Sequence, residues 1–445
     1  MPGVLRERNF RLLWLGQATS AFGSGVVPVA LAFAVIELTG SPAALGLVLS
    51  AGLVSRLCLL LLGGVVADRL PRQQVMVAAD ALRATTQGMV AVLLLTGTAH
   101  IWELLVLFAL FGAGDAFFSP ASTGLVPETV SPARLQQANS LMGIGRDAAR
   151  VTGPALAGLI VAGVGPGVAF AVDAATFVVS SVSLALLRLA PAGRSGDRSG
   201  VLADLRGGWH ELTSRSWVWL MIVKFSISTL AIAPYFVLGP FVAQHALGGA
   251  AAWGAIGTCG AVGAVLGNVV AFRVRPRRPL FTGCLAVSLY ALAPALLARP
   301  FPTAAICVAA AVGFGAVGFS DTLWFTALQE RIPSQALSRV SSYDWLGSLV
   351  LQPVGYVLAG PVAATIGIPA TLLVGAGVQA STSIGIALAP AVRGVRAKGS
   401  PEPGDEEVGG PPGAKPRTAR FRSLGAGRSV RSVNSAHPTR SRAPR

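Results

Sequence analysis

Long apolar stretches separated by short polar turns make up the first 392 residues of the chain. A helix that crosses a lipid bilayer needs about 20 mostly apolar residues. Twelve stretches meet that length: 12–36, 43–67, 74–97, 101–120, 139–163, 166–187, 216–243, 250–272, 279–298, 302–327, 336–360 and 367–390. Because a helix satisfies its own backbone hydrogen bonds in lipid, we predict an all-α integral membrane protein with twelve transmembrane helices.

Arginines are distributed unevenly between alternate loops. If the N-terminus is cytoplasmic, the inner segments before the tail hold seventeen arginines, from Arg6 to Arg339, whereas the outer loops hold only Arg299. Basic residues collect on the cytoplasmic side of membrane proteins. We therefore predict a multi-pass protein of the cell membrane with both termini in the cytoplasm.

The two halves of the chain repeat each other. The segment GGVVADRLPRQ at 63–73 matches GNVVAFRVRPR at 267–277, and the positions from Glu128 to Gly158 include six that recur 202 residues later. Since each half has six helices, both halves have the same orientation, as in transporters built from parallel repeats around a central cavity.

The repeat and the charge pattern together divide the chain into four parts. We predict six-helix bundles at 1–188 and 216–392, joined by a cytoplasmic linker at 189–215 with a surface helix near 203–212. Residues 393–445 hold 12 basic and 4 acidic side chains among Gly, Pro and Ser, which predicts a disordered basic tail.

Composition excludes several classes of function. Hydrophobic residues make up 53% of the chain and charged residues 12%, so the net charge of +16 indicates membrane topology and not nucleic-acid binding. The three lysines follow no glycine-rich nucleotide loop, and the four cysteines and four histidines have no metal-binding or hydrolytic spacing. We expect no enzyme activity, no metal and no cofactor, and we expect a monomer.

The segment GVVADRLPR, from Gly64 to Arg72, is a charged hinge between the second and third helices. Gly64 allows a close approach of helices, Asp68 suits the positive N-terminus of a neighbouring helix, and Arg69 and Arg72 suit acids or lipid phosphates. An ordinary positively charged loop is the alternative interpretation.

This hinge resembles the pattern G-x-x-x-D-R-x-x-R-[RK] of the major facilitator superfamily, with Gln73 in place of the last basic residue. The resemblance extends over residues 1 to about 392 and is to twelve-helix exporters of the bacterial enterobactin-exporter and macrolide-efflux type. It implies that Asp68 latches onto the start of helix 11, near 334–339, on the cytoplasmic side. In the second copy Phe272 replaces the acid, so the two hinges are not equivalent.

Helix 5 carries GRDAARVTGPALAG, which is similar to the antiporter motif of that superfamily at Gly145, Gly153, Pro154 and Gly158. A Gly-Pro pair kinks a helix and lets backbones pack closely, which suits a rocking surface. The resemblance favours an exporter over an importer.

Charged residues within the transmembrane helices are candidates for function, because such side chains usually point toward other parts of the protein or toward water. Asp115 in helix 4 is a candidate coupling acid. Arg146, Asp147 and Arg150 share one side of helix 5, where they form either a network linked to substrate and protons or a structural ion pair. We further expect Asp80 and Arg83 to pair, Arg56 to need a partner, Lys224 to snorkel, and three acids to line the pathway: Asp173, Asp321 and Asp344.

These features predict a secondary active transporter that exports an amphipathic or hydrophobic small molecule, such as a drug, antibiotic or siderophore-like metabolite, by proton antiport and alternating access. The substrate would bind between the halves, and the candidate contacts are Gln17, Asp115, Phe118, Tyr235, Trp324 and Phe325. An uptake symporter of the same fold and a non-transporting membrane sensor or scaffold remain alternatives.

Overall fold

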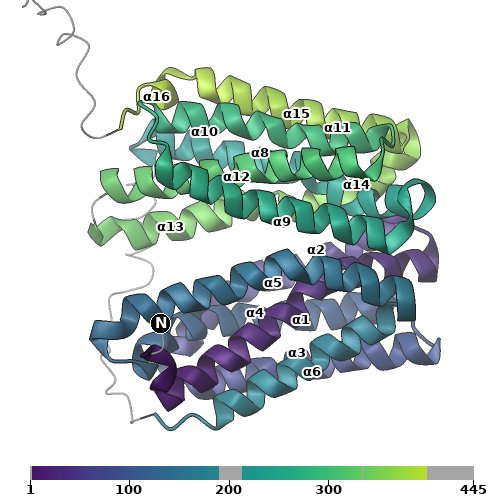
Figure 1. Ribbon diagram of the computed structural model, residues 1–445. Helices are drawn as coiled ribbons and strands as arrows, with labels where there is room; N and C mark the ends of the chain where they lie inside the picture. Colours follow the sequence, from purple (N-terminus) through teal and green to yellow (C-terminus); the bar gives the residue numbers. More distant parts are fainter. Residues whose placement is uncertain (1–2, 190–212, 333, 398–445) are drawn as a thin grey trace, which may run out of the picture. The chain divides into compact units, whose positions relative to one another are not determined.

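The computed structural model describes residues 3–189, 213–332 and 334–397, and within these ranges it contains helices and no strand (Figure 1). Twelve of its helical segments are long and apolar enough to cross a membrane, as the hydropathy pattern predicts. The predicted surface helix near 203–212 lies outside the described residues, as does the tail from 398 onwards.

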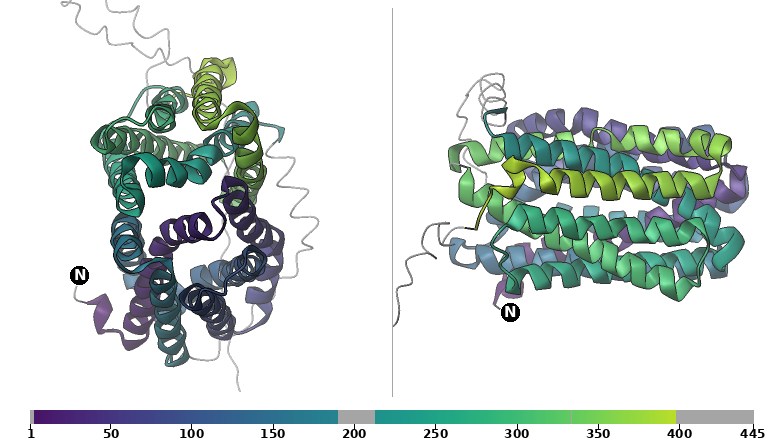
Figure 2. Two further views of the ribbon diagram at one scale, coloured as in Figure 1. Left: turned by 90° about the vertical axis from the view of Figure 1, so that its right-hand side faces the viewer. Right: turned by 90° about the horizontal axis from the view of Figure 1, so that it is seen from above.

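The first half of the chain supplies six long helices. They are α1 (Arg8–Thr39), α2 (Pro42–Arg69), α3 (Arg72–Thr96), α4 (Ile101–Thr129), α5 (Leu135–Val164) and α6 (Pro166–Ala185). The second half supplies α8 (Ser216–Val242), α9 (Gly249–Arg273), α10 (Pro279–Val287), α11 (Leu292–Ala298), α12 (Thr303–Arg331), α13 (Ser334–Leu349), α14 (Gln352–Ile366), α15 (Ile368–Leu388) and α16 (Pro390–Arg393). We call residues 3–189 the N half and residues 213–397 the C half; Figure 2 shows them side by side.

Two spans of the C half are not continuous helices. The ninth consists of α10, a 3-10 turn η4 (Ser288–Ala291) and α11, and the eleventh is broken between α13 and α14. Proline lacks a backbone N–H and cannot continue an α-helix. Pro294 in α11 and Pro353 near the start of α14 are therefore consistent with these breaks.

The helices run between two ends, which we name by the chain. The terminal end holds the start of the chain and the turn from α2 to α3, and the far end holds the turn from α1 to α2 (Figure 1). At the far end Gly40 and Gly97 end their helices with φ of +60° and +70°. Glycine adopts this left-handed conformation without the steric penalty that a Cβ brings.

Three apolar cores hold the helices together. The largest lies at the far end and contains side chains of both halves, such as Phe33 of α1 and Trp253 of α9. At the terminal end a second core, with Phe10, belongs to the N half alone, and a third, with Met221, belongs to the C half alone. The halves therefore share a core at the far end and have separate cores at the terminal end.

Small residues bring α2 of the N half against α14 of the C half at the far end. A Cβ added to Gly46 would lie 2.0 Å from the Tyr356 carbonyl oxygen, and one added to Gly360 would lie 2.5 Å from the Ala43 Cα. The Ser50 hydroxyl donates a hydrogen bond across this contact to the Pro353 carbonyl at 2.9 Å. Such close backbone approach is how helices associate in lipid, where little apolar surface remains to be gained.

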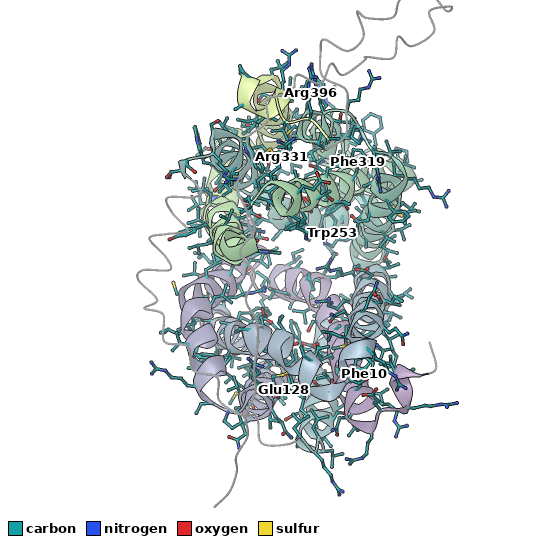
Figure 3. All side chains as sticks on the ribbon, turned by 90° about the vertical axis from the view of Figure 1, so that its left-hand side faces the viewer. Phe10, Glu128, Trp253, Phe319, Arg331 and Arg396 are labelled. Carbon is teal, nitrogen blue, oxygen red and sulfur yellow. The ribbon has the colours of Figure 1, made fainter. Side chains whose placement is uncertain are left out.

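The segment after the last span packs against the terminal end of the C half. Val392 and Val395 are buried in the C-half core, and the Ala397 amide donates to the Arg277 carbonyl at 3.0 Å. Arg331 of α12 hydrogen-bonds the Arg396 carbonyl, and both side chains are labelled in Figure 3. Packing thus continues to Ala397, five residues past the predicted end of the bundle at 392.

The helix pair α9 and α12 supports a prediction about stability. A Cβ on Gly267 would lie 1.9 Å from the Gly315 carbonyl oxygen, whereas the surroundings of Gly377 in α15 are open. We expect Gly267→Ala to destabilise the folded chain by about 1–3 kcal/mol, because α9 and α12 must move apart. Thermal unfolding of the purified protein in detergent would show a lower Tm than for Gly377→Ala. Equal Tm values for the two variants would contradict this packing.

Candidate functional site

Four charged side chains form a network inside the N half. The Asp115 carboxylate of α4 is 3.0 Å from the Arg56 Nε of α2 and 3.5 Å from an Arg83 guanidinium nitrogen of α3. Arg83 also pairs with Asp80, three residues earlier on the same face of α3. The expected Asp80–Arg83 pair is confirmed, and Asp115 is the partner that Arg56 requires.

Aromatic rings and a glycine fix the position of Arg83. Its guanidinium carbon lies 4.0 Å from the ring centre of Phe118 and 4.5 Å from that of Phe177. A Cβ on Gly114 would come within 2.9 Å of the Arg83 Cγ, so glycine leaves room for the arginine stem. Cation–π contacts strengthen when water is excluded, as it is around this buried side chain.

A second polar pair lies farther toward the far end. Asp173 of α6 is fully buried, and the Gln87 Nε2 of α3 donates a hydrogen bond to its Oδ2 at 2.7 Å. Sequence reasoning missed Gln87. It shares the α3 face of Asp80 and Arg83, because it lies seven and four residues after them, and that helical spacing is the signal that could have identified it.

The hinge between α2 and α3 is anchored by Arg72. This side chain donates to the Gly124 carbonyl at 2.9 Å and pairs with Glu128 at 2.8 Å. Gln73, which replaces the expected basic residue, donates to the carbonyls of Leu184 and Leu187, and therefore ties α3 to the end of α6.

The remaining hinge residues make few contacts. Arg69 is exposed, and a Cβ on Gly64 would meet open space, so no helix approaches Gly64 closely in this structure. The predicted latch between Asp68 and residues 334–339 lies outside the described side chains and stays a prediction.

The antiporter-like motif of α5 lies where three helices meet. Gly145 faces Ala18 of α1, and a Cβ on Gly153 would lie 2.7 Å from the backbone of Gly25, also in α1. One helical turn further along, the motif meets α9 of the C half. A Cβ on Gly254 would lie 2.4 Å from the Pro154 carbonyl oxygen, and one on Gly158 would lie 2.8 Å from the Ala250 carbonyl oxygen.

Three charged residues lie within the same motif, between Gly145 and Gly153. Arg146, Asp147 and Arg150 are exposed, and none of them forms an ion pair with a residue that the structure describes. The structural ion pair, one of the two expectations for these residues, is therefore not formed in this structure.

The candidate substrate contacts divide into two groups. Phe118 packs on the Arg83 guanidinium. Tyr235 lies in a cluster of aromatic rings with Trp253 and Phe314. Trp324 donates a hydrogen bond from Nε1 to the Asp344 carboxylate at 3.0 Å. All three are buried, so they support the helices and do not line an open surface. Gln17 is half-buried and Phe325 is exposed, so these two are available for contact.

Lys224 corrects another expectation. We expected this α8 side chain to snorkel toward the membrane surface, but only 1% of the residue is exposed. It interacts electrostatically with Asp321 of α12 and lies 4.5 Å from the Phe225 ring centre. Asp321 offsets part of the cost of burying the ammonium group, and the sequence spacing does not reveal this arrangement.

Among the described residues, no group of three or more His, Cys, Asp or Glu side chains is arranged to hold a metal ion. The candidate site has two parts. One is the charge network of Arg56, Asp80, Arg83 and Asp115 within the N half, and the other is the small-residue contact of α5 with α9 between the halves. This arrangement is suited to binding and to movement of helices.

Comparison with known proteins gives consistent results. The model of the Major Facilitator Superfamily matches residues 13–350. A multidrug efflux pump Tap from Mycolicibacterium fortuitum is 29% identical over 381 residues, which cover 81% of this chain and 91% of that protein. Macrolide efflux protein A from Streptococcus pyogenes is 22% identical over 249 residues, covering 54% of this chain and 60% of the relative. The crystal structure of the nucleoside transporter NupG has the same fold, with a TM-score of 0.68 at 14% identity, and the match covers 85% of this chain and 98% of NupG.

The charge network generates a second prediction. Arg83→Met removes the cation that Asp80 and Asp115 share, and breaking a buried ion pair costs about 3–5 kcal/mol. We expect a large fall in Tm by thermal unfolding in detergent, partly reversed by the double variant Asp80→Asn/Arg83→Met. Arg146→Gln is the control, because Arg146 has no ion-pair partner among the described residues and should leave Tm unchanged. A small effect of Arg83→Met would mean that the network does not stabilise the bundle.

Proposed function

Because the chain belongs to the Major Facilitator Superfamily, we propose that it is a secondary active exporter that moves amphipathic or hydrophobic small molecules across the cell membrane in exchange for protons. Relatives named as multidrug and macrolide efflux pumps support export and this class of substrate. In keeping with superfamily membership, we propose that the protein is not an enzyme and that it acts as a monomer without binding nucleic acid.

One observation carries the mechanism: the halves share a core at the far end and have separate cores at the terminal end. The arginine distribution supports a cytoplasmic terminal end. The structure then corresponds to the inward-facing state of an alternating-access cycle, in which substrate enters from the cytoplasm. Rocking of the halves about the far-end contacts would expose the substrate to the outside.

Two helix pairs would form the contacts of the opposite state. The helices α5 and α9 are antiparallel, with Pro154 against Gly254 and Gly158 against Ala250. Continuing this register toward the terminal end places Arg150 opposite Thr258 and Asp147 opposite Ala261. The exposed charges of α5 would thus face α9 when the terminal end closes, which accounts for their lack of partners in the inward-facing state.

The register of α2 against α14 supports the latch at Asp68. The antiparallel contacts of α2 with α14 pair Gly46 with Tyr356 and Ala43 with Gly360. Continued toward the terminal end, the register brings residue 68 to the start of α13 near Ser334. A carboxylate is stabilised at a helix N-terminus by the unpaired backbone N–H groups there. We propose that Asp68 makes this contact in the outward-facing state.

Export and its energy source can be measured in inverted membrane vesicles that contain the chain. We expect accumulation of erythromycin or ethidium that depends on an imposed proton gradient and is absent from vesicles lacking the chain. Transport that persists unchanged after the gradient is collapsed would refute proton coupling. Lack of accumulation of both probes would refute the proposed substrate class.

A variant pair on one helix tests the rocking surface. Gly158 packs against α9, whereas a Cβ on Gly163, also in α5, would meet open space. We expect Gly158→Leu to reduce erythromycin accumulation in the same vesicles at least tenfold, because leucine separates α5 from α9 and removes the far-end contact. Gly163→Leu should transport normally at equal expression. Equal transport by both variants would contradict the role of this contact.

A further inference from the structure

The buried acids of the N half differ in how their charge is balanced. Asp80 and Asp115 share two cations, Arg83 and Arg56, so this group of four is neutral. Asp173 is the additional acid, and it forms no ion pair with a residue that the structure describes. An ionised carboxylate without a paired charge is unfavourable in a membrane-embedded bundle.

The surroundings of Asp173 leave one of its oxygens without a partner. Oδ2 accepts from Gln87, whereas the buried Oδ1 has no hydrogen-bond partner. The neighbouring Thr176 hydroxyl donates to the backbone carbonyl of Asp173 at 2.7 Å, so its hydrogen is not available to Oδ1. The geometry therefore leaves Oδ1 as the atom on which a proton can reside.

The helices around Asp173 supply little compensating charge. On α1 the facing residue is Gly23, where an added Cβ would lie 2.4 Å from Oδ1. On α3 the facing groups are the neutral Gln87 and, one turn away, Arg83, which is the charged group that interacts with Asp173. Gain or loss of a proton thus changes the charge at the packed contact of α6 with α1 and α3.

A polar face links Asp173 to an exposed side chain of the N half. Gln87, Arg83 and Asp80 follow one another along α3 at helical spacing, and Arg83 contacts Asp115. Asp115 contacts Arg56, whose side chain is 46% exposed. This polar face therefore extends from the buried Asp173 carboxyl to the exposed Arg56 guanidinium within the N half.

We propose that Asp173 carries the coupled proton, an inference that rests on the proposed proton antiport. Its carboxylate accepts one proton from outside water in the outward-facing state and becomes a neutral carboxyl. In the inward-facing state the Asp173 carboxyl releases that proton to cytoplasmic water and becomes a carboxylate again. Asp115, clamped between two arginines, then has a positioning role and is not the carrier that the sequence suggests.

Infrared spectroscopy tests this assignment without a substrate. The full chain in lipid nanodiscs is titrated with acid while the carbonyl stretch of protonated carboxyl groups is followed by attenuated total reflection. We expect a pH-dependent component of the carboxyl band that the wild type and Asp115→Asn share and that Asp173→Asn lacks, whereas other buried acids such as Asp80 and Asp344 contribute equally to all three spectra. A wild-type minus Asp173→Asn difference spectrum without a carboxyl band, or loss of the component only in Asp115→Asn, would overturn the proposal.

A second variant pair covers the case in which Asp173→Asn does not fold. Gln87→Leu removes the hydrogen bond to Oδ2 and should change the midpoint of the carboxyl titration. Thr85→Val is the control on the same helix, because the exposed Thr85 hydroxyl donates only to the Ala81 carbonyl of α3, and it should leave the midpoint in place. Equal midpoints for wild type and Gln87→Leu would overturn the proposal.

A transport assay distinguishes a failure of the Asp173 assignment from a failure of the proposed antiport. Wild-type vesicles that show no gradient-driven erythromycin accumulation would refute the antiport itself. If the wild type accumulates the probe, we expect Asp173→Asn to lose at least 90% of that accumulation while it retains erythromycin binding in nanodiscs. Unchanged accumulation by Asp173→Asn would refute the role of Asp173 and leave the antiport intact.

Discussion

Close approach of helix backbones at small residues is the constraint on which this structure depends. Helices in lipid gain little from burying apolar side chains against one another, so they associate where glycine and alanine let backbones pack. At the far end, Gly46 with Tyr356 and Gly158 with Ala250 join the two halves in this way. The contact is mainly apolar, with the hydrogen bond from Ser50 to the Pro353 carbonyl across it, which makes it suitable as a surface about which the halves can rock.

Charge is distributed very differently in the two halves. Within the described residues, every ion pair between side chains involves residues of α1 to α5 or the segments that connect them, and thus belongs to the N half. The C half instead buries single polar groups, such as Lys224 near Asp321 and Asp344 against the Trp324 ring nitrogen. The two halves therefore share a helix arrangement but differ in their charged residues, as Phe272 in the place of Asp68 also shows.

The sequence was sufficient to predict the twelve spans, because hydropathy and helix length are local properties. The pairing of Asp80 with Arg83 was also predictable, since the two residues are three apart on one helix. Contacts between helices were not: nothing in the spacing shows that Asp115 of α4 meets Arg56 of α2, or that Trp324 is buried against Asp344. In the proposed cycle the surroundings of the α5 charges change with conformational state, and a sequence does not specify which state is populated.

The central claim is that the halves alternate between contact at the far end and contact at the terminal end. Double electron–electron resonance can test it in nanodiscs, with spin labels at Ser41 and the exposed Thr365 for the far end and at Leu70 and Val274 for the terminal end, in a chain whose four cysteines are serine. As pH is varied, we predict that the terminal-end distance shortens whenever the far-end distance lengthens. Distances that change in the same direction, or a terminal-end distance that stays fixed while the far end opens, would contradict the account.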